Sequence, residues 1–205
     1  MNTQIQRYEN IPIELPSKEI IKRLSSGKAG TKALPDRFSQ IVNQAYSEIS
    51  LSGVSRILEV DRIGEDKRLI LENGVIFTGG HITRFLQDAR YALLYSSFCT
   101  GSYYEKIKDF FNKGFSDYGV IYDAVAGELA DRGMDFINTK ERARLIRSGA
   151  AVSKKRFSPG YGDFVLEHQS IFYRLLKLSQ YNIQLTDSYI FIPEKTVTAV
   201  SPIFT

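Results

Sequence analysis

The sequence predicts an α+β fold, a single domain with a mainly antiparallel β-sheet and flanking helices. Strand-like and helix-like segments follow one another without the regular strand–helix–strand alternation that is typical of a parallel sheet. The dipeptide Asn73-Gly74 stands between two β-rich runs and is a strong hairpin signal. Hydrophobic residues make up 43% of the 205 residues, which suffices for a core, and no stretch has the composition of a flexible linker. We therefore expect one domain over residues 1–205, with an N-terminal helical portion at about residues 1–53.

Two helices are expected in that N-terminal portion. Ser17 is placed to cap a short helix that ends near Gly27. Pro35 suits the first turn of a second helix, which we expect Gly53 to terminate. The apolar face of the second helix repeats at helical spacing and comprises Phe38, Ile41, Val42, Ala45, Tyr46 and Ile49.

The middle of the chain holds the expected strands. Residues 57–60 form one strand, and residues 68–72 and 75–77 form a hairpin around Asn73-Gly74. Residues 91–98 are an almost continuous apolar run of strand length, which is typical of a strand covered on both faces.

Helices are expected between and after these strands. One covers residues 82–89, a second begins at a Ser102 cap, and the longest covers residues 116–137. A further helical stretch is expected at residues 140–146. Gly127 lies inside the longest helix at a cost of about 1 kcal/mol in helix propensity, which indicates a packing reason.

The last third of the chain is expected to contain one helix and two strands. The helix covers residues 164–178, and the strands cover residues 185–192 and 196–204. These elements complete the mixed, non-alternating order on which the fold class depends.

Composition and charge exclude several classes of function. The formal net charge of +4 is a mild excess that does not require a nucleic-acid partner, and we expect none. No run approaches the roughly 20 apolar residues of a membrane span, and no signal peptide is visible, so we expect a cytoplasmic protein without a membrane partner. Cys99 is the single cysteine, which rules out an intramolecular disulfide or a multi-cysteine metal site, and we expect it to be buried.

The segment Arg156-Phe-Ser-Pro-Gly-Tyr-Gly-Asp163 is the most unusual in the chain. Pro159 fixes φ, whereas Gly160 and Gly162 permit backbone angles that are closed to other residues, so the loop exposes main-chain polar groups. Arg156 offers a planar donor fork suited to a carboxylate, and Tyr161 offers a face for a purine or a cation. The same residues are also compatible with an ordinary tight turn between a strand and a helix, with an arginine on the surface.

The segments around this loop resemble a known family. Arg-x-x-Pro-Gly-Tyr, the later Leu185-Thr-Asp-Ser-Tyr189 with Pro193, and the strand Lys195-Thr-Val-Thr-Ala-Val200 are similar to the end of the activation domain of cobalamin-dependent methionine synthase. Upstream, Phe98-Cys-Thr-Gly101 and Tyr122-Asp-Ala-Val-Ala-Gly127 look like family segments in the family's order. The Ser-Pro-Gly-Tyr-Gly-Asp form of the loop looks closest to free-standing members of that family.

The resemblance implies a binding site for S-adenosylmethionine. It places Arg156 on the carboxylate of the ligand, Gly160 and Tyr161 against the ligand, and main-chain groups of Ser158 beside it. On the longest helix the family uses an acidic residue, which falls on Asp131, and Glu128 one turn earlier is the rival. The chain shows no catalytic dyad and no metal site, and it lacks the Asp-x-His-x-x-Gly that presents a histidine to cobalt in such enzymes.

The expected function is an accessory module that holds S-adenosylmethionine for the reductive methylation of a corrinoid cofactor. Cobalamin would be met only through a corrinoid-binding protein or methyltransferase, with a flavodoxin-like electron donor as a further partner. One alternative is a non-catalytic module of the same fold that binds another small molecule or a protein. A second is an unrelated enzyme that uses Asp163, Glu167 and His168.

Overall fold

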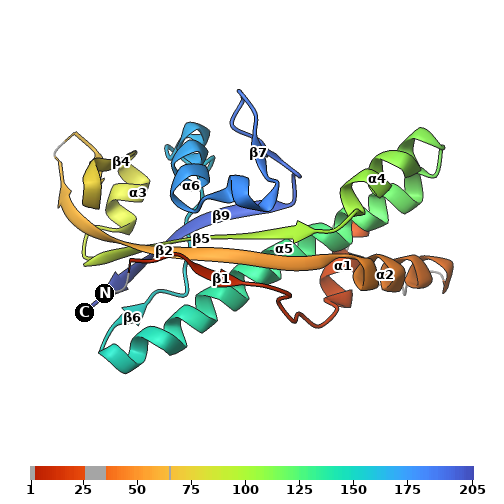
Figure 1. Ribbon diagram of the computed structural model, residues 1–205, viewed down its shortest axis with the longest axis horizontal. Helices are drawn as coiled ribbons and strands as arrows, with labels where there is room; N and C mark the ends of the chain where they lie inside the picture. The colour runs from red at the N-terminus through yellow and green to blue at the C-terminus, as the bar shows by residue number, and fades with distance from the viewer. Residues whose placement is uncertain (1–2, 26–35, 65) are drawn as a thin grey trace.

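The computed structural model describes residues 3–25, 36–64 and 66–205, and it contains a seven-stranded sheet with helices on both faces (Figure 1). The strand order is β4-β3-β2-β5-β9-β6, β1 pairs with β2, and every pairing is antiparallel. The strands are β1 (Gln6–Tyr8), β2 (Ser50–Ile63), β3 (Arg68–Leu71), β4 (Val75–Thr78), β5 (Tyr91–Thr100), β6 (Ala151–Val152) and β9 (Thr196–Phe204). The predicted α+β fold with a mainly antiparallel sheet is confirmed.

The strand β5 is the centre of the sheet. It pairs with β2 from Ser50↔Thr100 to Glu59↔Tyr91, and with β9 from Tyr91↔Ile203 to Phe98↔Thr196. Residues 92–99 of this strand, which include Cys99, are all buried. The expected strand with two covered faces is therefore present.

One face of the sheet packs against the long helix α5 (Ser116–Leu145), which runs diagonally across it in Figure 1. The helices α1 (Ser17–Leu24), α2 (Asp36–Glu48) and α4 (Tyr103–Asn112) pack against α5. A Cβ at Gly133 would overlap the hydroxyl of Ser97, so the lack of a side chain there lets helix and sheet approach closely.

The opposite face carries α3 (Gly80–Phe85), α6 (Gln169–Leu175) and short 3₁₀ turns at Leu166–His168 and Leu178–Tyr181. Further 3₁₀ turns lie at Glu72–Gly74 and Ile146–Ser148. A small hairpin of β7 (Gln184–Leu185) and β8 (Phe191–Ile192) lies on the α6 side of the sheet (Figure 1). The buried aromatic rings of Phe77, Phe98, Phe164 and Phe172 belong to the core of this second face.

Several predicted elements differ from the observed ones. The helix α2 ends at Glu48, and Gly53 lies inside β2, where a Cβ would come within 2.6 Å of the carbonyl oxygen of Ser96. The first 53 residues therefore hold β1 and the start of β2 as well as two helices. The hydroxyl of Ser17 donates to the carbonyl of Leu15 instead of capping α1, and Ser102 precedes α4 without a side-chain capping bond. Gly27 and Pro35 lie outside the described residues.

Three further differences lie in the second half of the chain. The long helix continues to Leu145 and absorbs the separate stretch expected at residues 140–146. The expected helix at residues 164–178 is broken into a 3₁₀ turn, α6 and a second 3₁₀ turn. The expected strand at residues 185–192 is the hairpin of β7 and β8, closed by the Thr186 N–H donating to the Ile190 carbonyl at 2.9 Å. Within the described residues, no helix is long and apolar enough to cross a membrane.

Candidate functional site

The loop of residues 156–163 follows β6 and is tied to the edge of the sheet at its start. Phe157 exchanges two backbone hydrogen bonds with Val200 of β9, at 3.0 and 2.9 Å. The loop then turns on Gly160, whose φ of 93° lies in the region that favours glycine. The Gly160 N–H donates to the carbonyl of Phe164 at 2.7 Å, which closes the turn. The loop is thus a backbone-bonded structure held against β9.

The end of the loop is fixed to helix α3 by Asp163. Its carboxylate accepts the backbone N–H groups of Gly80 and His81, at 2.7 and 3.0 Å, and lies 2.8 Å from Nδ1 of His81. The backbone N–H of His81, followed by the His81 ring, lowers the pKa of the Asp163 carboxyl to about 2. Asp163 therefore fixes the loop end to the start of α3.

The histidine next to this end is part of the core. His168 is buried, and its ring stacks on that of Phe164 at 4.8 Å between centroids. Its Nε2 accepts the backbone N–H of Thr78 at 3.2 Å, which requires an unprotonated nitrogen. Burial lowers the pKa of His168. Asp163 and His168 thus make separate structural contacts, Asp163 with the start of α3 and His168 with Thr78 and Phe164.

A cavity of about 390 Å³ opens beside the first half of the loop. The loop, the helix α5, the start of α6 and the strand β9 all contribute to its wall. Its lining comprises Asp131, Arg156, Phe157, Ser158, Pro159, Tyr161, Gln169, Thr196, Val197 and Thr198. Four of the five residues expected to bind a ligand, Asp131, Arg156, Ser158 and Tyr161, therefore line one cavity, and Gly160 lies between two of the lining residues in the same loop.

Two larger hollows, of about 550 and 520 Å³, lie along the N-terminal segment of residues 10–16. Neither includes a residue of the 156–163 loop. The loop cavity is the better candidate site because charged, hydroxyl, amide and aromatic side chains from distant segments converge on it, which volume alone does not provide.

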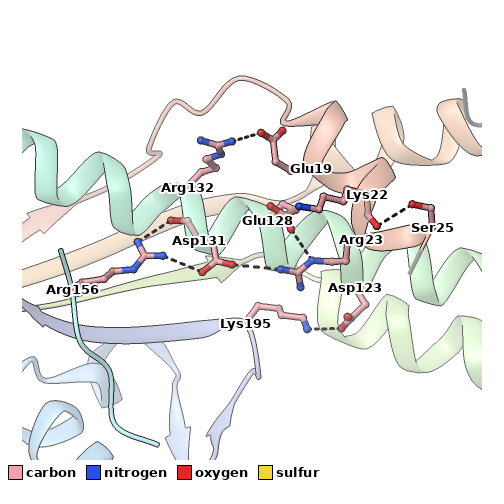
Figure 2. Close-up of polar contacts among 10 residues, drawn as sticks. All are labelled: Glu19, Lys22, Arg23, Ser25, Asp123, Glu128, Asp131, Arg132, Arg156 and Lys195. Atoms are coloured by element: carbon pink, nitrogen blue, oxygen red, sulfur yellow. Dashed lines mark hydrogen bonds and ion pairs between the residues drawn. The ribbon is translucent and has the colours of Figure 1, made fainter. Parts of the chain in front are cut away.

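The guanidinium of Arg156 points at helix α5 (Figure 2). Its Nη2 lies 3.4 Å from Oδ1 of Asp131, and its Nη1 lies 2.9 Å from Oδ1 of Asp135. Nη1 also donates to the main-chain carbonyl of Asp131 at 3.4 Å. The donor fork is therefore held at the cavity wall by two carboxylates that are themselves largely open to solvent.

Of the two acidic candidates on α5, Asp131 lines the cavity and Glu128 does not. Asp131 lines the cavity and contacts Arg156. Glu128 instead accepts from Nε of Arg23 on α1 at 2.7 Å, and its side chain is only 14% exposed. Arg23 also reaches Asp131, with Nη2 at 3.5 Å from Oδ2.

The cavity combines groups for several parts of a zwitterionic ligand. Arg156 can bind a carboxylate, Asp131 can accept from an ammonium, and Gln169 and Thr198 add an amide and a hydroxyl that already bond each other. Tyr161, at 67% exposure, presents its ring at the surface beside the cavity. Such a set of groups can recognise and orient a small molecule.

The sequence did not single out several of these residues. Asp135 lies four positions after Asp131 on α5, so helical spacing could have placed it on the same face. The packing of α1, α6 and β9 brings four further residues to the site: Arg23 from α1, Gln169 from α6, and Thr196 and Thr198 from β9. No pattern local to those residues signals that position.

The single cysteine of the chain, Cys99, lies in the core. Burial raises the pKa of the Cys99 thiol to about 12, so it is an inert core residue, as expected. Among the residues that the structure describes, no group of three or more histidine, cysteine, aspartate or glutamate side chains could hold a metal ion.

Comparison with known proteins gives a match in structure and none in sequence. No family model matches the sequence, and no curated protein matches it. The structure is similar to the MetH reactivation domain bound to AdoHcy, with a TM-score of 0.67 and 15% sequence identity. The match covers 97% of this chain and 78% of the other chain. At this identity, the likeness establishes a shared fold.

Proposed function

We propose that the chain binds S-adenosylmethionine, or its demethylated product S-adenosylhomocysteine, in the cavity beside Arg156. The observation that carries the proposal is the convergence of Asp131, Arg156, Ser158 and Tyr161 on one cavity. The resemblance to the methionine synthase activation domain assigned these residues to the ligand from sequence. The fold shared with a reactivation domain bound to AdoHcy gives independent support.

The residues of the cavity fit this ligand class in chemistry and in size. An Arg–carboxylate bond contributes about 1.5–3 kcal/mol net, and a cation over an aromatic face about 0.5–2 kcal/mol. The cavity volume of about 390 Å³ lies within the usual range for small-molecule sites. Arg156 would hold the ligand's carboxylate, Asp131 its ammonium, and Tyr161 its adenine or sulfonium end.

The part played by the chain is to position a ligand, with no general base required. When bound, S-adenosylmethionine would supply a methyl group as CH3⁺ and become S-adenosylhomocysteine, and with one electron from a flavodoxin-like donor this would convert a cobalt(II) corrinoid to its methylated cobalt(III) form. That corrinoid would belong to a separate corrinoid-binding protein or methyltransferase. The exposed face of Tyr161 beside the cavity is compatible with such a partner approaching from solvent.

A second candidate is a module of the same fold that binds a different small molecule or a protein. The observation that favours it is the engagement of both terminal nitrogens of Arg156 by Asp131 and Asp135. A ligand carboxylate has to share the guanidinium of Arg156 with these two aspartates, whereas a ligand without a carboxylate does not.

Calorimetric titration with S-adenosylmethionine and S-adenosylhomocysteine separates the two candidates. We expect wild-type protein to bind, and Arg156→Ala to bind about 10- to 100-fold more weakly, because the ligand's carboxylate loses its charged donor. Arg147→Ala, which changes an arginine outside the cavity lining, is the matched control and should bind like wild type. Absence of binding by wild-type protein would contradict the first candidate and leave the second.

A further inference from the structure

Arg23 approaches the candidate site from helix α1 and contacts Glu128 and Asp131 of α5, which lie more than 100 residues away in sequence. Its guanidinium lies across α5, with Nε 2.7 Å from Glu128 and Nη2 3.5 Å from Asp131 (Figure 2). The side chain is 41% exposed, so it is held by these two carboxylates more than by burial.

Gly127 gives this guanidinium the room it occupies. A Cβ at Gly127 would stand 2.6 Å from Nη1 of Arg23 and 3.2 Å from its Cζ. A glycine in the middle of a helix costs about 1 kcal/mol relative to alanine. The packing reason indicated by Gly127 in the sequence is thus the passage of an arginine side chain over the helix.

The carboxylate of Asp131 is shared between two arginines. Its Oδ1 faces Nη2 of Arg156, and its Oδ2 faces Nη2 of Arg23. Arg156 has a further carboxylate partner in Asp135 at 2.9 Å. Without Arg23, both carboxylate oxygens of Asp131 would be free to turn to Arg156. Asp131 would then compete with the ligand's carboxylate for the same guanidinium.

We propose that Arg23 is a positioning residue that engages Oδ2 of Asp131 and so limits the contact of that carboxylate with Arg156 to Oδ1, which leaves donors of the Arg156 fork for the carboxylate of an amino-acid-bearing ligand. The inference rests on the proposed function and deepens it. Among the described residues, Arg23 makes its hydrogen bonds with Glu128 and Asp131 and is not one of those that line the cavity, so it would act on the amino-acid end of the ligand through Asp131. Its effect is therefore confined to ligands that carry a carboxylate.

The test compares two probes that differ only at the amino-acid end. S-adenosylhomocysteine carries the carboxylate and ammonium, whereas 5′-methylthioadenosine keeps the adenosine and the thioether and lacks both charges. We expect Arg23→Ala to weaken S-adenosylhomocysteine about tenfold and to leave 5′-methylthioadenosine unchanged in calorimetric titration. Gly127→Ala should give the same selective loss, because its Cβ displaces the guanidinium without removing the charge.

Two controls make the result specific. Arg37→Ala removes an exposed arginine that lies 4.0 Å from Asp117, and it should bind both probes like wild type. Arg23→Lys keeps the charge but not the fork that spans Glu128 and Asp131, so its loss of affinity should be smaller than that of Arg23→Ala.

The outcomes distinguish a failure of the role inferred for Arg23 from a failure of the proposed ligand binding. Equal losses for both probes would mean that Arg23 only supports the fold, and unchanged affinity for S-adenosylhomocysteine would mean that it does not position Asp131. Either result overturns the inference while the proposed function stands. If wild-type protein binds neither probe, the proposed function fails and the inference fails with it.

Discussion

The side chains at the two ends of the 156–163 loop make different kinds of contact, and Phe157 also ties the start of the loop to β9 by backbone hydrogen bonds. At its end, Asp163 accepts two backbone N–H groups from the start of α3, and the next residue, Phe164, is fully buried among aromatic rings. At its start, the side chain of Arg156 contacts two solvent-exposed carboxylates on α5. Backbone bonds and buried rings fix a loop, whereas exposed ion pairs can exchange partners at little cost.

This difference assigns separate tasks to the two ends. The backbone bonds of Phe157 and the contacts of Asp163 set the position of the loop, whereas the side chain of Arg156 is left able to accept a new anion. A binding loop needs both properties, since a fixed scaffold reduces the entropy lost on binding while the recognising group must be able to release its resting partner. Variants at the two ends should therefore separate stability from affinity.

The largest expected effect on stability is that of Phe164→Ala. The ring is fully buried and lies 5.2 Å from the ring of Phe77 and 4.8 Å from that of His168. We expect its removal to lower the free energy of unfolding by about 3–5 kcal/mol, from lost burial and the cavity left behind. Urea denaturation followed by circular dichroism measures the change. A loss below about 1 kcal/mol would mean that the burial of Phe164 does not anchor the Asp163 end of the loop.

Asp163→Asn should come next. An amide accepts backbone N–H bonds more weakly than a carboxylate, so the start of α3 loses part of its anchor. We expect the Tm to fall by a few degrees at pH 7, measured by differential scanning calorimetry. The difference from wild type should shrink as pH falls from about 4 towards 2, because the wild-type carboxyl, with its pKa near 2, then takes up a proton. A constant difference across this range would contradict the role of the charge.

A pH effect of intermediate size is expected from His168. Burial lowers its pKa below the ordinary value of 6.5, so the folded state binds a proton less readily than the unfolded chain. The stability that His168 contributes is present above about pH 6.5, and it decreases as pH falls from 6.5 through the lowered pKa. Urea denaturation at pH 7.5 and 5.5 should show a smaller pH-dependent loss for His168→Gln than for wild type. Identical losses would show that His168 is not the titrating group.

The smallest stability effect is expected at the opposite end of the loop. Arg156→Ala removes ion pairs with largely exposed carboxylates, and such pairs contribute about 0–1 kcal/mol. The free energy of unfolding should therefore change by less than about 1 kcal/mol, although the affinity for S-adenosylhomocysteine falls. A large loss of stability would place Arg156 among the structural residues.

The sequence predicts those parts of the fold that local patterns determine. The hairpin at Asn73-Gly74 and the strand Thr196–Phe204 appear where hydrophobic patterning and turn chemistry place them. The apolar pattern predicts one strand over residues 185–192. The turn-forming run Thr186-Asp187-Ser188 lies inside it, and the β7–β8 hairpin reverses there. The local sequence predicts that Gly53 ends a helix. A glycine is needed there because Ser96 and Ile137 approach closely, and residues next to Gly53 in sequence do not indicate that approach.

The candidate site was predictable only in part for the same reason. Arg156 and Tyr161 belong to a loop whose proline and glycines are visible in the sequence, and Asp131 came from the family resemblance. The contact of Arg156 with Asp131 and Asp135 depends on the packing of α5 across the sheet. The role that we infer for Arg23 depends in addition on where α1 docks on α5, which no pattern within residues 17–24 specifies.

A crystal structure of the protein grown with S-adenosylhomocysteine tests the central claim most directly. We expect the ligand's carboxylate at hydrogen-bonding distance from the guanidinium of Arg156, with Asp131 retained by Arg23 and the adenosine beside Tyr161. A ligand bound elsewhere on the molecule, with Arg156 still paired to Asp131 and Asp135, would contradict the account.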